Sequence, residues 1–97
     1  MAMVRYKWIP TADGGRRTLP AGPFMRYPIE FGSGPDENGV LWDVVFCFEC
    51  PAKFDADQVG TIEYSNERAP RQRLEAGVEF RLLEGHKPVV IGTILSD

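Results

Sequence analysis

The fold is decided by one stretch, Val40-Leu41-Trp42-Asp43-Val44-Val45-Phe46-Cys47-Phe48-Glu49. Every second residue from Trp42 to Phe48 is large and apolar, whereas Asp43 and Glu49 lie on the opposite face of an extended chain. Aromatic and β-branched side chains on one face are typical of a half-buried sheet. The stretch therefore predicts a β-strand that packs against an apolar core.

Five further stretches show the same alternation, separated by turns rich in Gly and Pro. The residues that we expect to point inward from them are Val4, Tyr6 and Trp8; Tyr27, Ile29 and Phe31; Ile62 and Tyr64; Val78, Phe80 and Leu82; and Val89 and Ile91. Pro28 cannot donate a ladder hydrogen bond, so its strand is predicted to be an edge strand or bulged. Gly60 and Gly92 lie inside strands and predict sharp bends.

The chain of 97 residues is long enough for one domain, which we expect to span residues 1–97. Six short antiparallel strands predict a small barrel or a sandwich. Closure into a barrel removes the exposed strand edges that favour aggregation. We therefore predict an all-β domain, a six-stranded antiparallel closed β-barrel with Greek-key-like closure. Its interior is expected to be filled by the large aromatic side chains.

Four segments between the strands predict turns or loops. Asp13-Gly14-Gly15 predicts a reversal, because glycine adopts a positive φ without steric cost. A long polar turn is expected from Gly32 to Gly39, and a polar loop from Ser65 to Gln72. Glu84-Gly85-His86-Lys87 predicts a tight turn before the last strand.

The charge balance disfavours broad, non-specific binding to nucleic acid. The formal net charge is −3, and such binding needs clustered cations that neutralise phosphates. Eight of the eleven cations are Arg, the side chain suited to bidentate contacts with carboxylates or phosphates. Two groups of them are close in sequence: Arg16, Arg17 and Arg26, and Arg68, Arg71 and Arg73. Solvated loops are the simplest interpretation of both groups.

Cys47 and Cys50 form a Cys-x-x-Cys pair at the end of the central strand. One such pair supplies half of a zinc site, and His86 is the only histidine that could contribute. A redox pair normally opens a helix, but here Pro51 follows an extended run. Two reduced thiols, one of them partly buried, are the expected state, and a small thiol- or metal-dependent site is the alternative.

No apolar run approaches the ~18 residues needed to cross a membrane. The start, Met1 to Arg5, lacks an apolar signal core, so we expect a cytoplasmic protein without a membrane partner.

Two ordered patterns carry a resemblance to a known family. The first contains Gly14-Gly15-Arg16-Arg17-Thr18-Leu19-Pro20 and then Arg26-Tyr27-Pro28-Ile29-Glu30-Phe31. The second, from Glu75 to Leu95, has a Gly-x-x-Phe strand, a Glu-Gly turn and an apolar last strand. In order and spacing they resemble the C-terminal β-barrel domain of translation elongation factor Tu, over about half of the chain.

That resemblance implies a stand-alone, divergent copy of a six-stranded barrel from a bacterial translation protein. In the family the domain has no catalytic residues and docks aminoacyl-tRNA, the exchange factor and the GTPase domain. The surface implied for contact with a protein partner or RNA consists of Arg16, Arg17, Arg26, Glu84, Gly85, His86 and Lys87.

The chain also departs from the family. It has no phosphate-binding GxxxxGK[ST] motif, and Pro35 to Pro51 has no counterpart. Arg17 replaces a histidine, His86 replaces a glycine, and Glu30 replaces a glutamine where a carboxylate would repel phosphates. A non-catalytic module that docks a protein is therefore our first expectation, and RNA or tRNA binding is the alternative.

An enzyme is disfavoured. Asp43 and Glu49 on one strand are about 20 Å apart, too far for paired acid–base chemistry. Ser33, Ser65 and Ser96 lie outside any nucleophile-elbow pattern. We expect no catalytic residue, no metal and no cofactor.

Overall fold

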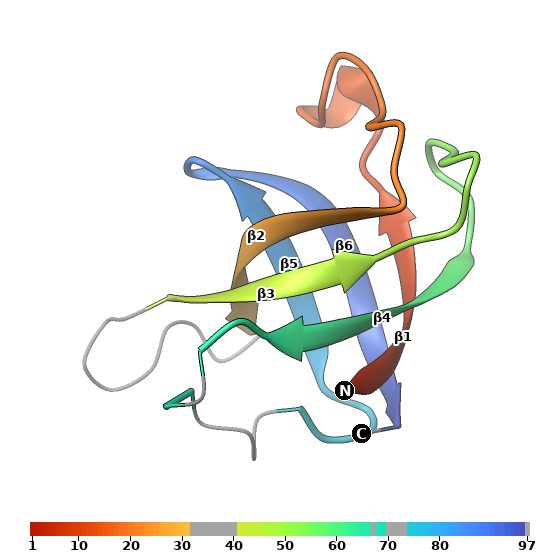
Figure 1. Cartoon of the computed structure of the whole chain (residues 1–97). Helices are drawn as coiled ribbons and strands as arrows, with labels where there is room; N and C mark the ends of the chain where they lie inside the picture. The colour runs from red at the N-terminus through yellow and green to blue at the C-terminus, as the bar shows by residue number, and fades with distance from the viewer. Residues whose placement is uncertain (32–40, 67, 70–73, 97) are drawn as a thin grey trace.

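The computed structural model describes residues 1–31, 41–66, 68–69 and 74–96 (Figure 1). It is an all-β domain, and six antiparallel strands form a closed barrel, as predicted. The strands are β1 (Ala2–Trp8), β2 (Phe24–Phe31), β3 (Trp42–Cys47), β4 (Gln58–Tyr64), β5 (Glu79–Glu84) and β6 (Lys87–Ser96). In the described part of the chain no helix is long and apolar enough to span a membrane. The turn expected at residues 32–39, Arg71 and Arg73 lie outside the described residues.

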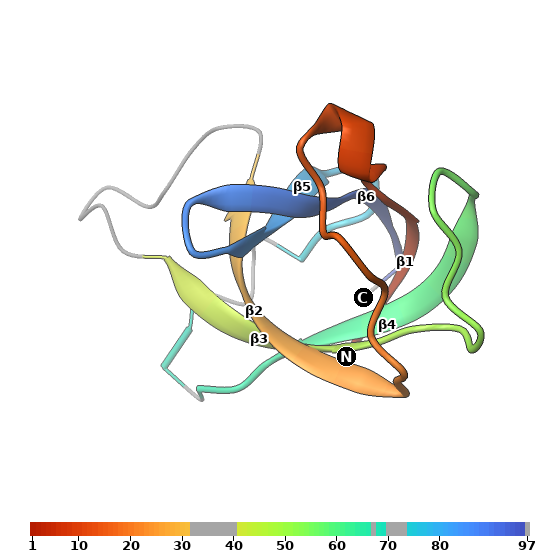
Figure 2. The same cartoon turned by 90° about the horizontal axis from the view of Figure 1, so that it is seen from above.

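The strand order around the barrel is β1-β4-β3-β2-β5-β6, and β6 pairs with β1 to close it (Figure 2). The consecutive strands β2, β3 and β4 are neighbours, and β1 lies beyond β4. This arrangement is a Greek key, in which a long connection separates the outlying strand from the other three. The β5–β6 hairpin then fills the gap between β2 and β1.

Alternate side chains of all six strands fill the interior of the barrel. The fully buried ones with the largest volumes are Trp8, Tyr6, Phe46, Phe80, Ile29, Ile62, Leu82 and Ile94. The rings pack edge to face or tilted, with centroids 4.7 Å apart for Tyr6 and Phe46 and 5.3 Å apart for Trp8 and Phe48. The aromatic core predicted from the central strand is therefore confirmed.

The prediction for the last strand is wrong at Ile91, which is 44% exposed on the outside of the barrel. Val89 and Val90, in contrast, are both fully buried. The cause is an irregularity in the β5–β6 ladder between Leu82 and Leu83, both of which are also buried. An irregular step of this kind interrupts the alternation, so the faces that follow it are reversed. Trp42 and Val78 are only partly buried, at the margin of the core.

The strand that contains Pro28 is not an edge strand, because β2 lies between β3 and β5. Pro28 is in register with Asp43 of β3, but the pairing of β2 with β5 begins one residue later, at Ile29. The proline therefore occupies a position where the ladder to β5 requires no donor.

The glycines inside β4 and β6 allow neighbouring atoms to approach closely. A Cβ at Gly60 would lie 2.3 Å from the carbonyl oxygen of Cys47, and one at Gly92 would lie 2.6 Å from that of Arg5. A side chain at either position would overlap the backbone of the next strand.

Candidate interaction surface

The connection from β1 to β2 passes over one end of the barrel, the same end at which the β5–β6 turn lies (Figures 1 and 2). It begins with a short 3-10 helix, Thr11–Asp13, which ends at Gly14 with φ of 92°. The next residue, Gly15, is buried, and a Cβ there would lie 1.8 Å from the carbonyl oxygen of Ile9. The predicted reversal is confirmed, and its two glycines serve different needs: positive φ at Gly14 and absence of a side chain at Gly15.

This reversal positions Arg16, whose side chain is 20% exposed. Its Nη1 lies 2.5 Å from Oε2 of Glu84 and donates a hydrogen bond of 3.0 Å to the hydroxyl of Tyr27. Its Nε donates to the carbonyl oxygen of Thr18 at 2.9 Å. One local contact, to Thr18, and two contacts to distant parts of the chain, Tyr27 and Glu84, thus hold one guanidinium in place.

The β5–β6 turn consists of two residues, since Glu84 and Lys87 form the last pair of the ladder. Gly85 has φ of 65° and His86 is exposed. A positive φ at the first central position is typical of the type II′ turn that suits a hairpin. Lys87 Nζ donates to the carbonyl oxygen of Gly15 at 3.3 Å. The structure therefore brings the turn and the β1–β2 connection together.

We call this region the loop–turn surface; it consists of Arg16, Arg17, Glu84, Gly85, His86 and Lys87. Arg17 is exposed beside Arg16 on the connection. Arg26 lies apart from it, exposed on the outer face of β2 and in register with Val45 of β3. Neither Arg17 nor Arg26 forms an ion pair with any residue that the structure describes.

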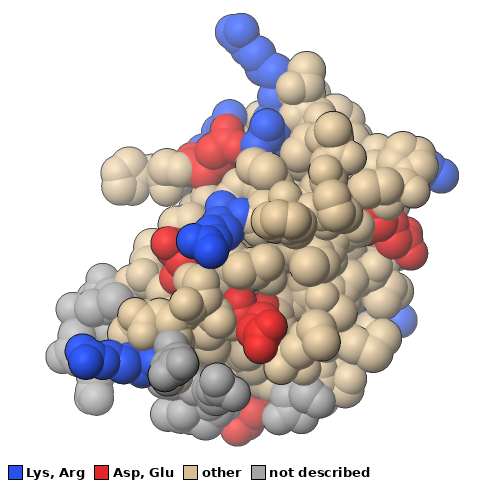
Figure 3. Space-filling model, viewed as in Figure 1, with Lys and Arg blue, Asp and Glu red and all other residues tan. Residues whose placement is uncertain are grey.

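The electrostatics of this end of the barrel differ from those of the whole chain. The loop–turn surface holds three cations, Arg16, Arg17 and Lys87, and the carboxylate of Glu84, and Asp13 precedes it on the same connection. The whole chain, in contrast, has a net charge of −3. Figure 3 shows several Lys and Arg side chains over the upper part of this face, beside acidic atoms. Glu30, the carboxylate that we expected to repel phosphates, forms an ion pair with Arg81 of β5.

Two residues of β2, Tyr27 and Phe24, have features that the sequence pattern does not predict. The ring of Tyr27 is buried, as predicted, and its hydroxyl also accepts the hydrogen bond from Arg16. Phe24 is 57% exposed on the outer face of β2, two residues before Arg26.

Burial raises the pKa of two tyrosine hydroxyls at this end of the barrel, those of Tyr6 and Tyr27. Burial raises the pKa of Tyr27 above its ordinary value of 10.0, although the Arg16 guanidinium acts in the opposite direction. Burial also raises the pKa of Tyr6, whose hydroxyl accepts a hydrogen bond from the backbone N–H of Glu49 at 2.8 Å. Both phenols are therefore more firmly protonated in the folded protein than in the unfolded chain.

The stability of the protein is consequently expected to fall at alkaline pH. Below the unfolded pKa of about 10 both states hold the phenol protons, so this contribution is fully present there. As the pH rises further, the phenols of the unfolded chain lose their protons first. The free energy of unfolding therefore decreases. Urea unfolding between about pH 8 and about pH 11 should show this decline, and Tyr27→Phe should make it less steep. Constant or rising stability over that interval would contradict the burial of these hydroxyls.

The cysteines do not differ in burial as expected, because both Cys47 and Cys50 are free and exposed. Cys47 points outward at the end of β3, in register with Phe24 and Thr61. The thiol of Cys50 lies 3.6 Å from the carbonyl oxygen of Ala21. No group of three or more His, Cys, Asp or Glu that could hold a metal ion is present within the described segments.

The sequence matches no protein-family model and no curated protein. The likeness to the elongation factor Tu barrel therefore depends on the two sequence patterns quoted above.

Proposed function

We propose that this protein is a non-catalytic interaction module, similar to the C-terminal barrel of elongation factor Tu, that docks a protein partner through the loop–turn surface and Arg26. The observation that carries the proposal is the position of Arg16, which Glu84, Tyr27 and Thr18 hold in one place at the end of the barrel. Around this fixed guanidinium, Arg17 and His86 are exposed to solvent.

A fixed surface favours specific docking because side chains that are already ordered lose little conformational freedom on binding. Arginine is also enriched among the residues that dominate binding energy at protein interfaces. Phe24 adds an exposed aromatic side chain on the same strand as Arg26. Aromatic and arginine side chains together are the usual anchors of such interfaces.

A protein partner agrees better than RNA with the charges. Glu84 offsets the charge of Arg16, and Glu30 offsets that of Arg81 on the neighbouring strands. Binding to phosphates instead requires several cations that are free to replace counterions. The packed aromatic interior supports recognition on the outside, because barrels with fewer than about eight strands are filled by their own side chains.

The test is a comparison of variants that share the fold. In a native lysate, the double variant Arg17→Glu/Arg26→Glu is expected to retain at least about tenfold less of the partner protein than the wild type, since both changes place carboxylates at the interface. Arg68→Glu is the matched control. Arg68 is exposed in the connection between β4 and β5, and β4 ends at the opposite end of the barrel because it runs antiparallel to β1 (Figure 1). Quantitative mass spectrometry measures the amount of partner protein that each of the two variants retains.

Capture that is unchanged in the double variant, or equally reduced in Arg68→Glu, would refute docking at this surface. The RNA alternative is separated by nuclease treatment and by salt. A complex held by phosphate contacts disappears with ribonuclease and weakens steeply as salt rises. The proposed protein complex survives the nuclease.

A further inference from the structure

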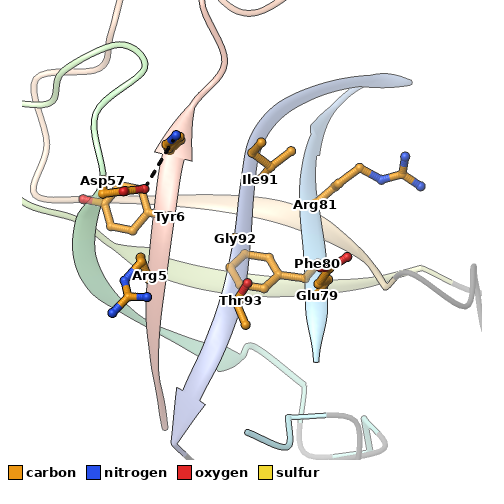
Figure 4. A pocket seen from close by; sticks show the side chains of 10 residues that line it. Arg5, Tyr6, Asp57, Glu79, Phe80, Arg81, Ile91, Gly92 and Thr93 are labelled. Atoms are coloured by element: carbon orange, nitrogen blue, oxygen red, sulfur yellow. Dashed lines mark ion pairs between the residues drawn. The ribbon is translucent and has the colours of Figure 1, made fainter. Parts of the chain in front are cut away.

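A groove of about 480 Å³ runs along the outside of the barrel over β1, β6 and β5, away from the loop–turn surface (Figure 4). Two rows of side chains cross it, each in register on the three strands. In one row Lys7, Ile91 and Arg81 are neighbours. In the other row Arg5, Thr93 and Glu79 are neighbours. Figure 4 shows Arg5 and Glu79 on opposite sides of β6.

The charges in the two rows differ in how they are satisfied. Lys7 lies 3.9 Å from Asp57, and Arg81 pairs with Glu30, so both cations of the first row have an acidic neighbour. In the second row, Arg5 and Glu79 are exposed, and neither forms an ion pair with a described residue. One free cation and one free anion therefore flank β6 symmetrically, each one strand away from it.

The outside of the barrel also exposes apolar side chains on β1, β4 and β6, namely Met3, Val59, Ile91 and Leu95. Of these, Ile91 lines the groove. Val59 is in register with Arg5, and Ile91 lies at the centre of the groove. An exposed apolar side chain such as Ile91, with charged side chains on both sides of it, is typical of a surface that another protein covers.

We propose that this face binds a second copy of the same chain, with a two-fold axis parallel to β6. Such an axis places β1 of one copy opposite β5 of the other. Arg5 of the first copy therefore meets Glu79 of the second, and Glu79 of the first copy meets Arg5 of the second. A two-fold interface requires this kind of self-complementary pair. Ile91 of each copy then packs against Ile91 of the other, which removes an exposed apolar side chain of each groove from water.

The remaining charged groups are compatible with this arrangement. The axis places Lys7 opposite Arg81, but each of these cations is accompanied by its own carboxylate, Asp57 or Glu30. In the first row, each copy therefore presents two ion pairs of its own, Lys7 with Asp57 and Arg81 with Glu30, and the repulsion between Lys7 and Arg81 is small. The ion pairs between the copies come from the second row.

Charge reversal tests the proposal with the intact chain. Arg5→Glu leaves two carboxylates on the face, and Glu79→Arg leaves two guanidinium groups. Each variant alone places like charges opposite each other in a dimer, and its dissociation constant should rise at least about tenfold. An equimolar mixture of the two variants restores both ion pairs between unlike copies and should form a heterodimer. Analytical ultracentrifugation over a range of concentrations measures all of these states.

Arg68→Glu, at the opposite end of the barrel, should dimerise like the wild type, and circular dichroism checks that each variant is folded. A wild type that stays monomeric at millimolar concentration overturns the proposal. It would mean that this face is exposed to solvent or binds a different protein. Single variants that dimerise normally, or a mixture that stays monomeric, overturn it as well. Loss of partner capture by the Arg17→Glu/Arg26→Glu variant is independent of these results.

Discussion

Replacing Phe46 with Ala is expected to lower the free energy of unfolding by about 3–5 kcal/mol. Phe46 is fully buried in β3, and its ring lies 4.7 Å from that of Tyr6 and 5.7 Å from that of Trp8. Removing it leaves a cavity at the centre of the aromatic cluster, which neighbouring strands of a closed barrel cannot collapse to fill. Domains of this size are stable by about 5–15 kcal/mol, so the loss is a large fraction of the total.

Phe24→Ala is the matched control, because it deletes the same ring from an exposed position on the adjacent strand. It should change stability by less than about 0.5 kcal/mol. Urea denaturation followed by tryptophan fluorescence measures both variants. Equal effects of the two substitutions would mean that Phe46 does not lie in the core.

Gly15→Ala is expected to destabilise the protein by about 3 kcal/mol, the upper end of the usual cost of overpacking. The added Cβ would lie 1.8 Å from the carbonyl oxygen of Ile9, and a backbone atom has no other rotamer to adopt. The connection must therefore move. Because Lys87 donates to the carbonyl oxygen of Gly15, the contact with the β5–β6 turn is lost together with the position of Arg16.

Gly14→Ala separates this effect from backbone strain. Gly14 has φ of 92°, but no atom lies within 4 Å of the Cβ position, so alanine there should cost only about 1–2 kcal/mol. Amide chemical shifts of the turn residues His86 and Lys87 should change strongly in Gly15→Ala and little in Gly14→Ala. Unchanged shifts and stability in Gly15→Ala would show that the connection does not contact the turn as described.

The sequence alone predicts most of the barrel because alternation has a simple physical cause. A residue such as Phe46 cannot face water without cost, and its neighbours two positions away share its face. The alternation does not predict the position of Ile91. The register between β5 and β6 shifts at Leu82 and Leu83, and this shift depends on how the two strands pair. No local pattern within either strand reveals it.

The candidate site is less visible in the sequence. Arg16 and Glu84 were both expected at the surface through the family resemblance, but they are separated by 68 positions along the chain. Their ion pair exists only because closure of the barrel places the β1–β2 connection beside the β5–β6 turn. The groove has the same origin, since Arg5 and Glu79 become neighbours of Thr93 only through the register of three strands.

The most direct test of docking at the loop–turn surface is photo-cross-linking in the cell. A photoreactive amino acid replaces the exposed His86 in the turn, and in a second protein it replaces Arg68 at the opposite end of the barrel. The account predicts one ribonuclease-resistant protein adduct from position 86 and none from position 68. Adducts formed equally from both positions, an adduct with RNA, or no adduct from position 86 would contradict it.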